Sequence, residues 1–170
     1  MNDDSNPKQP NDGNRKAPSP DASQGSSESS HTGRYRGQYH HADPARIQEI
    51  LSDSLNLALT SQNLETSESR FELARECFRE LSERLLPDQA FDGLKENFAR
   101  AALDFPTVHR TNAIKRLLGL AENAKRAGTK LKYLQEAQRI AREGLNDPTA
   151  RKDELESLFA IVSKRVLLVK

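Results

Sequence analysis

The chain has 170 residues, a net charge of +1 and a single cysteine, Cys77. This length provides one domain or two small subdomains, and a lone cysteine excludes an intrachain disulfide. The N-terminus has neither a basic region nor an apolar stretch of the kind that secretory signals need, and the longest apolar runs are far too short to span a bilayer. We therefore expect a cytoplasmic protein that does not enter a membrane.

The N-terminal segment differs sharply in composition from the rest. Residues 1–43 contain no Val, Ile, Leu or Phe, and Ile47 is the first such residue in the chain. A segment rich in Ser, Asn, Gln, Pro and Gly cannot bury enough apolar surface to offset the conformational entropy lost on folding. We predict that residues 1–43 form a disordered polar tail.

The end of this tail has a character of its own. Residues 31–41 combine two arginines, two tyrosines and three histidines. Tyr and Arg are frequent anchors in binding sites because they combine a large contact area with polar groups. Three readings remain open: a linear motif, a segment that folds back on the core, or a plain linker. The residues of the predicted linear motif are Arg34, Tyr35, Arg36 and Tyr39.

Apolar residues at alternating steps of three and four predict amphipathic helices from Asp43 onward. Asp43 followed by Pro44 is a favourable helix start, with Asp as the N-cap and Pro in the first turn. Three helices are predicted in the first half of the core, which covers residues 44–105. They are one from Pro44 to about Gln62, one capped by Thr66 or Ser67 and ended by Pro87, and one capped by Asp88 and ended at Phe105.

The second half, residues 106–170, repeats the scheme after Pro106. Gly128 is predicted as the C-cap that ends the fourth helix, and Thr129 as the N-cap of the fifth. Asp147 and Pro148 repeat the start signal for the sixth helix, which runs to the end of the chain.

The two halves also resemble each other in their apolar positions. Leu51 aligns with Ile114 and Ala74 with Ala137, at a spacing of about 63 positions. Apolar positions repeat while polar ones do not, which is typical of a duplicated packing unit. We predict an all-α fold of about six helices in antiparallel hairpins, built as two related three-helix units, 44–105 and 106–170, that pack as one helical-repeat-like domain.

Charge divides unequally between these units. Residues 44–105 hold 7 Lys and Arg against 12 Asp and Glu, whereas residues 106–170 hold 14 against 7. Basic residues flank the turn predicted at Gly128, where the free amides of a helix capped by Thr129 could receive a phosphate. The residues predicted to contact phosphate or an acidic partner are Arg116, Lys125, Arg126, Lys130 and Lys132.

Nothing in the pattern converges on catalysis. His109 lies just after Pro106 and is predicted to be a surface histidine in a linker. Cys77 lies on the apolar side of its helix among acidic residues and is predicted to be a core residue rather than a nucleophile. We therefore predict no enzymatic activity, no cofactor and no metal site.

These observations favour a non-catalytic protein–protein interaction or scaffolding module with a flexible N-terminal tether. The last predicted helix carries extra apolar residues, Ile161, Leu167 and Leu168, so it is either central in the bundle or a docking surface. The alternative is a nucleic-acid-associated accessory protein that binds the phosphate backbone through the basic half. The opposite charges of the two halves are also compatible with self-association.

Overall fold

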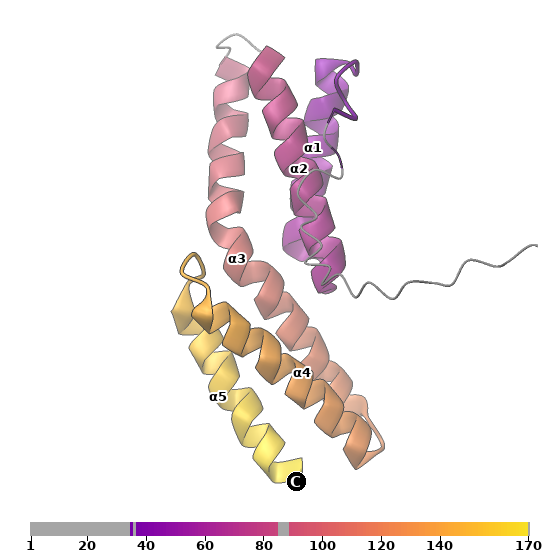
Figure 1. The fold of residues 1–170 in the computed structure, drawn as a ribbon, viewed down its shortest axis with the longest axis vertical. Coiled ribbons are helices and arrows are strands. Elements are labelled where there is room, and N and C mark those ends of the chain that lie inside the picture. The colour runs from indigo at the N-terminus through magenta and orange to yellow at the C-terminus, as the bar shows by residue number, and fades with distance from the viewer. Residues whose placement is uncertain (1–34, 36, 85–88, 170) are drawn as a thin grey trace, which may run out of the picture.

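The chain is α-helical in the part that the structure, a computed structural model, describes: residues 35, 37–84 and 89–169. Those ranges contain no strand, which confirms the all-α class, but they hold five helices instead of the six predicted. No helix within them has both the length and the apolar character that a membrane span requires. The helices are α1 (Pro44–Thr60), α2 (Leu64–Arg84), α3 (Gln89–Asn123), α4 (Ala127–Asn146) and α5 (Lys152–Val169), as Figure 1 shows.

The prediction of six helices is wrong because α3 continues through Pro106, where a break was expected. A proline inside a helix removes one hydrogen bond and costs about 3 kcal/mol. Contacts from distant parts of the chain surround this point. The Arg110 guanidinium donates to the Pro106 carbonyl and pairs with Asp147 at 2.7 Å, and the Arg151 amide donates to the Thr107 hydroxyl. The predicted boundary between residues 105 and 106 thus falls inside one long helix.

The core consists of two clusters that share α3. One is formed by α1, α2 and the first part of α3, and the other by the last part of α3 with α4 and α5. Phe98 packs against the first cluster and Ile114 lies in the second. At about 100° per residue these two side chains lie about 160° apart around the helix axis, so α3 offers nearly opposite sides to the two clusters. Ala74 and Ala137, both predicted to face inward, are fully buried, one in each cluster.

Phenylalanines fill the space between α2 and α3, which diverge as ribbons in Figure 1. They recur every seven residues on both helices, so they share one side of each helix. The rings stack nearly parallel, with centroids 4.2 Å apart for Phe78 and Phe98 and 4.0 Å apart for Phe71 and Phe105. His109 continues the stack, 4.4 Å beyond Phe105. This row of rings connects α2 to α3 from Phe91 down to the middle of the molecule.

The start of α1 follows the sequence prediction. The Asp43 carboxylate accepts a hydrogen bond from the Ala45 amide, and Pro44 occupies the first turn. α2 begins earlier than predicted, because Asn63 caps it by accepting from the Thr66 amide at 3.0 Å. Ser67 lies inside α2, where its hydroxyl donates to the Ala58 carbonyl and ties α2 to α1.

The start signals predicted in the second half are wrong. α3 ends at Asn123, whose side-chain amide donates to the Gly119 carbonyl one turn earlier. α4 then begins at Ala127, so Gly128 and Thr129 lie inside its first turn and cap neither helix.

Asp147 does not start α5 either. Its carboxylate accepts from the Thr149 amide and hydroxyl and binds Arg110. α5 begins several residues later, at Lys152.

Gly144 allows α4 to approach its neighbours closely. A Cβ atom there would lie 2.8 Å from Leu155 Cδ1 and 3.0 Å from Arg110 Cδ, whereas a Cβ at Gly119 would meet nothing within 4 Å. Alanine gains about 1 kcal/mol in helix propensity over glycine, but overpacking a core typically costs about 1–3 kcal/mol. We expect Gly144→Ala to lower the free energy of unfolding by about 1 kcal/mol and Gly119→Ala to raise it by about 0.5–1 kcal/mol. Urea denaturation of both variants measures this, and equal stabilisation of the two would contradict the close contact.

Candidate functional site

The largest apolar side chains exposed on α5 lie toward its end. Leu167 and Leu168 are 73% and 77% exposed, and Ile161 is 45% exposed. They lie on the side of α5 away from the buried Leu158 and Val162. These exposed side chains were recognisable in the sequence, because this helix carries apolar residues on several sides and not only along the stripe that fills the core.

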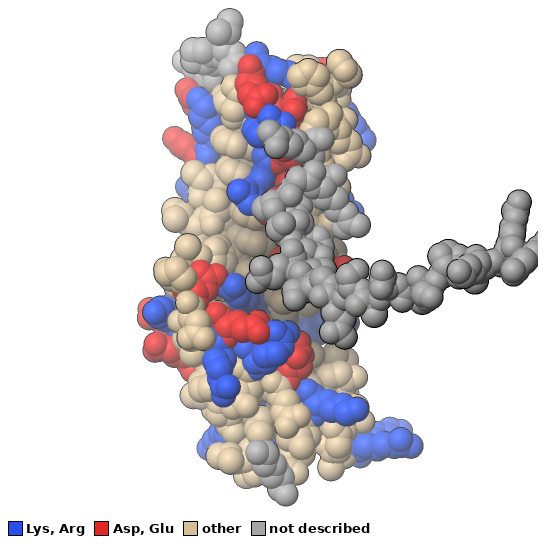
Figure 2. All heavy atoms as spheres, viewed as in Figure 1, with Lys and Arg blue, Asp and Glu red and all other residues tan. Residues whose placement is uncertain are grey.

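Basic residues lie at the same end of the molecule, where the turn between α3 and α4 comes close to the end of α5 (Figure 1). Figure 2 shows the lower end in tan and blue, with the acidic residues gathered higher up. Among the residues that the structure describes, Lys125, Arg126 and Lys130 form no ion pair, whereas most arginines of α2 do. Residues 160–169 also contain no Asp or Glu. We call this surface the C-terminal face; it comprises Ile161, Leu167, Leu168, Lys125, Arg126 and Lys130.

A groove of about 310 Å³ opens on the C-terminal face between α3, α4 and α5. Lys130 and Arg165 line it, and the Arg165 guanidinium is already paired with Glu122. Lys130 therefore contributes the uncompensated positive charge. The apolar part of the lining consists of Ala121, Leu134, Leu168 and Val169.

The predicted basic residues do not share one depression. Lys130 lines the groove of the C-terminal face, but Arg116 lines a smaller depression of about 250 Å³, between α3, α4 and the connection from α1 to α2. Glu65 and Glu136 line that second depression beside Arg116. Lys132 is exposed on α4. The predicted phosphate site does not have the expected geometry, because Thr129 lies inside α4 and does not cap it.

The predicted linear motif lies only partly in the described residues, since Arg34 and Arg36 are outside them. Tyr35 and Tyr39 are half-buried against the first core cluster. The Tyr35 hydroxyl forms a hydrogen bond with the hydroxyl of Ser69 in α2, at 2.8 Å. Of the three readings of this segment, the described residues 35 and 37–41 show the one in which it folds back on the core.

The prediction for His109 is wrong: it lies inside α3 and is only 4% exposed, because the helix that was expected to break at Pro106 continues and packs. Nδ1 donates to the Phe105 carbonyl, so the neutral ring carries its proton on Nδ1. Burial lowers the pKa of His109 to about 4; the nearby Arg110 also lowers it, and Asp147 opposes this. Nε2 lies 3.9 Å from Glu68.

Cys77 is fully buried, which confirms its prediction as a core residue. Burial, together with the negative charges of Glu76 and Glu80, raises the pKa of its thiol to about 12. Such a thiol is not a nucleophile at neutral pH. Within the described part of the chain, no three His, Cys, Asp or Glu side chains gather as metal ligands.

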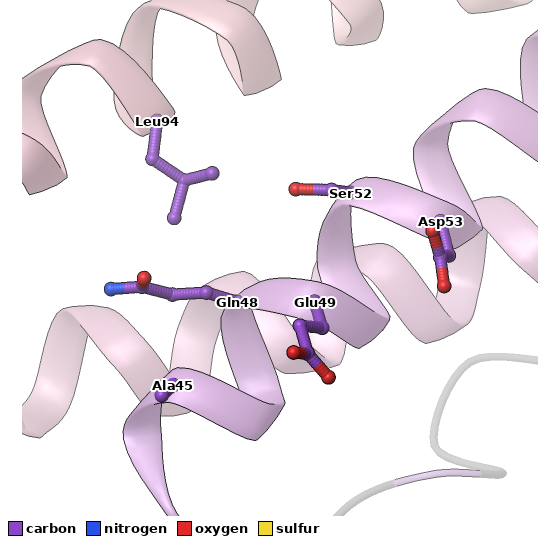
Figure 3. Close-up of a pocket in the computed structure, with 6 residues that line it drawn as sticks. All are labelled: Ala45, Gln48, Glu49, Ser52, Asp53 and Leu94. Carbon is purple, nitrogen blue, oxygen red and sulfur yellow. The ribbon is translucent and has the colours of Figure 1, made fainter.

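A wide, open depression of about 670 Å³ lies between α1 and the first part of α3 (Figure 3). Glu49 in its lining pairs with Arg46 at 2.6 Å. The residues that line it beside Ser52 include no histidine. The lining consists of Ala45, Gln48, Glu49, Ser52, Asp53 and Leu94.

The C-terminal face thus combines exposed leucines, a groove and uncompensated positive charge at one end of the molecule. Comparison of the chain with protein-family models, curated proteins and solved structures finds no match in any of the three.

Proposed function

We propose that this chain is a non-catalytic protein–protein interaction module that binds an acidic, amphipathic segment of a partner protein on its C-terminal face. The single observation behind the proposal is the exposure of Leu167 and Leu168 at the end of the molecule that also carries Lys125, Arg126 and Lys130. The two core clusters support an organisation as two three-helix units that stack along α3. Because residues 35 and 37–43 pack against α2, only residues 1–34 of the predicted tail would serve as the tether, and the single cysteine favours a cytoplasmic location.

The exposed leucines provide the binding energy in this proposal. Burying a large aliphatic side chain contributes about 1.5–3 kcal/mol. A partner helix that covers Leu167, Leu168 and Ile161 would remove all three from water. The groove beside Leu168 is wide enough to receive one apolar side chain of that partner.

The surrounding charge selects the partner. Lys125, Arg126 and Lys130 form no ion pair within the described residues, because the nearby Glu122 is paired with Arg165, so acidic groups on a partner would find unpaired cations at the rim. Complementary charge of this kind speeds association and rejects partners of the wrong sign. The same like charges disfavour pairing of two copies through this face.

Nucleic acid is the less favoured occupant. Phosphate contacts would use the same lysines, but exposed leucines contribute little to a phosphate interface, and aromatic residues that stack on bases are absent from the C-terminal face. The test below includes nucleic acid as a competing outcome.

The test uses the full chain and two synthetic amphipathic helices, each with leucines along one side and either glutamate or lysine elsewhere. We expect the glutamate peptide to bind in fluorescence anisotropy, more weakly as salt is added, and the lysine peptide not to bind. The double change Leu167→Glu and Leu168→Glu should abolish binding, because both side chains are exposed and the fold should survive. The double change Lys125→Glu and Lys130→Glu should weaken binding by at least about ten-fold.

Arg100→Glu is the matched control. It reverses an exposed charge on the first part of α3, away from the C-terminal face, and should leave binding unchanged. Equal binding of both peptides, or full binding by the leucine variant, would overturn the proposal. The nucleic-acid alternative would be established by a fluorescent RNA that binds the wild-type chain, binds the lysine-to-glutamate variant more weakly and binds the leucine-to-glutamate variant with unchanged affinity.

A further inference from the structure

Residues 35 and 37–43 form a turn-rich segment that lies along α2, and we call this segment the latch. It runs in the same direction as α2: Tyr35 bonds to Ser69, and the Gly37 amide donates to Glu76 at 2.8 Å. Further on, His40 Nδ1 lies 3.5 Å from the Glu80 carboxylate. One side of α2 is therefore occupied by this segment.

Arg84 fastens the other end of the latch. Its guanidinium donates to the carbonyls of Tyr39 and Ala42, at 2.5 and 2.7 Å, and to Glu80 at 3.0 Å. The Glu80 side chain is only 2% exposed and also receives a hydrogen bond from Arg79. A buried carboxylate held by two guanidinium groups keeps Arg84 in place, and Arg84 in turn satisfies the turn carbonyls of the latch.

The latch covers part of the first core cluster. Tyr35, Tyr39 and Ala42 pack against that cluster, which contains the fully buried Cys77. Burial and the charge of the Cys77 thiolate raise the pKa of Tyr39. Removing the latch would uncover part of the cluster to which Cys77 belongs.

The contacts that hold the latch differ from those that hold the helices. Apart from the packing of Tyr35, Tyr39 and Ala42, they are a few polar bonds to α2, several of them at the surface, and Gly37 takes a backbone conformation with φ +75° that favours glycine. Segments held by few apolar contacts open at lower free energy than the core of a protein. The latch can therefore open while α1 and α2 stay folded.

We propose that the latch is a conformational switch that keeps the Tyr35 and Tyr39 side chains hidden against α2 and releases them, together with access to Cys77, when it opens as a unit. A partner that binds these tyrosines binds only the open state. Its apparent affinity is therefore its intrinsic affinity multiplied by the fraction of molecules that are open. This switch is independent of binding at the C-terminal face.

Cys77 is the only cysteine, so its labelling by a thiol reagent in the full chain reports opening directly. For the wild-type chain we expect labelling faster than global unfolding allows, with a rate that barely changes at low denaturant. Arg84→Ala, which removes both carbonyl contacts, should accelerate labelling at least ten-fold. Gly37→Ala should accelerate it about five- to thirty-fold, because the positive φ becomes strained for a residue with a side chain.

If Arg84→Ala fails to fold, Gly37→Ala still tests the proposal. A Cβ at Gly37 would touch nothing within 4 Å, so the backbone strain of the positive φ stays within the latch. Arg75→Ala is the matched control, since it removes an exposed arginine of α2 whose ion-pair partner is Glu72. The control should label at the wild-type rate. Labelling that follows global stability in every variant, or an unchanged rate in Gly37→Ala, would overturn the switch.

Discussion

Ala137→Glu and Ala74→Glu are each expected to lower the free energy of unfolding by about 3–5 kcal/mol, since both place an unpaired carboxylate in a position with no exposure. Both alanines lie where helices approach closely, Ala74 in the cluster of α1, α2 and α3 and Ala137 in the cluster of α3, α4 and α5. A loss of this size is a large fraction of the total stability of a small domain. Thermal and urea denaturation followed by circular dichroism measure it.

Ala99→Glu is the control for these changes, because Ala99 is an exposed residue of α3 and should tolerate glutamate. If either core variant is too unstable to purify, Ala74→Val and Ala137→Val replace it, with an expected loss of about 1–3 kcal/mol from overpacking. Tolerance of glutamate at both positions would contradict the two-cluster core. Loss at only one would show that the clusters differ in how tightly they pack.

Acidification is expected to destabilise the wild-type chain through His109. The folded pKa of about 4 lies below the ordinary value of 6.5, so the unfolded state takes up a proton at a higher pH than the folded state does. The stabilisation is therefore complete above pH 6.5 and is lost as the pH falls from 6.5 toward 4. A difference of this size corresponds to about 3 kcal/mol.

His109→Phe is the variant that isolates this effect, because it keeps an aromatic ring next to Phe105 and has no titrating group. The free energy of unfolding, measured by urea denaturation between pH 4 and 8, should fall more steeply with acid in the wild-type chain than in the variant. Above pH 6.5 the two should depend on pH in parallel, which serves as the internal control. Parallel curves at every pH would show that folding does not lower the pKa of His109.

The long-range contacts explain why the position of His109 was not predictable from its neighbours in the chain. A proline three residues before it indicates a break, and a histidine after a break indicates a surface. The helix continues because Arg110 reaches Asp147 and Thr107 accepts from Arg151, residues that lie 37 and 44 positions away. No local pattern contains those partners.

The packing of the latch was likewise not predictable from residues close to it in the chain. Its composition was compatible with a motif, a linker or a folded segment, and Tyr35 and Ser69, whose hydrogen bond decides among them, are 34 positions apart. Arg84 lies 45 positions from Tyr39, whose carbonyl it binds. A short polar segment becomes ordered here because α2 offers donors and acceptors along one side.

The all-α class, the inward positions of Ala74, Cys77 and Ala137, and the N-cap of α1 at Asp43 were predictable from the chain, because helix periodicity and N-capping act between residues a few positions apart. The continuity of α3, the burial of His109 and the packing of the latch on α2 were not predictable in this way. Each of these depends on contacts between distant residues. The free energy of those contacts offsets a local cost, such as that of a proline inside a helix or of ordering a polar segment.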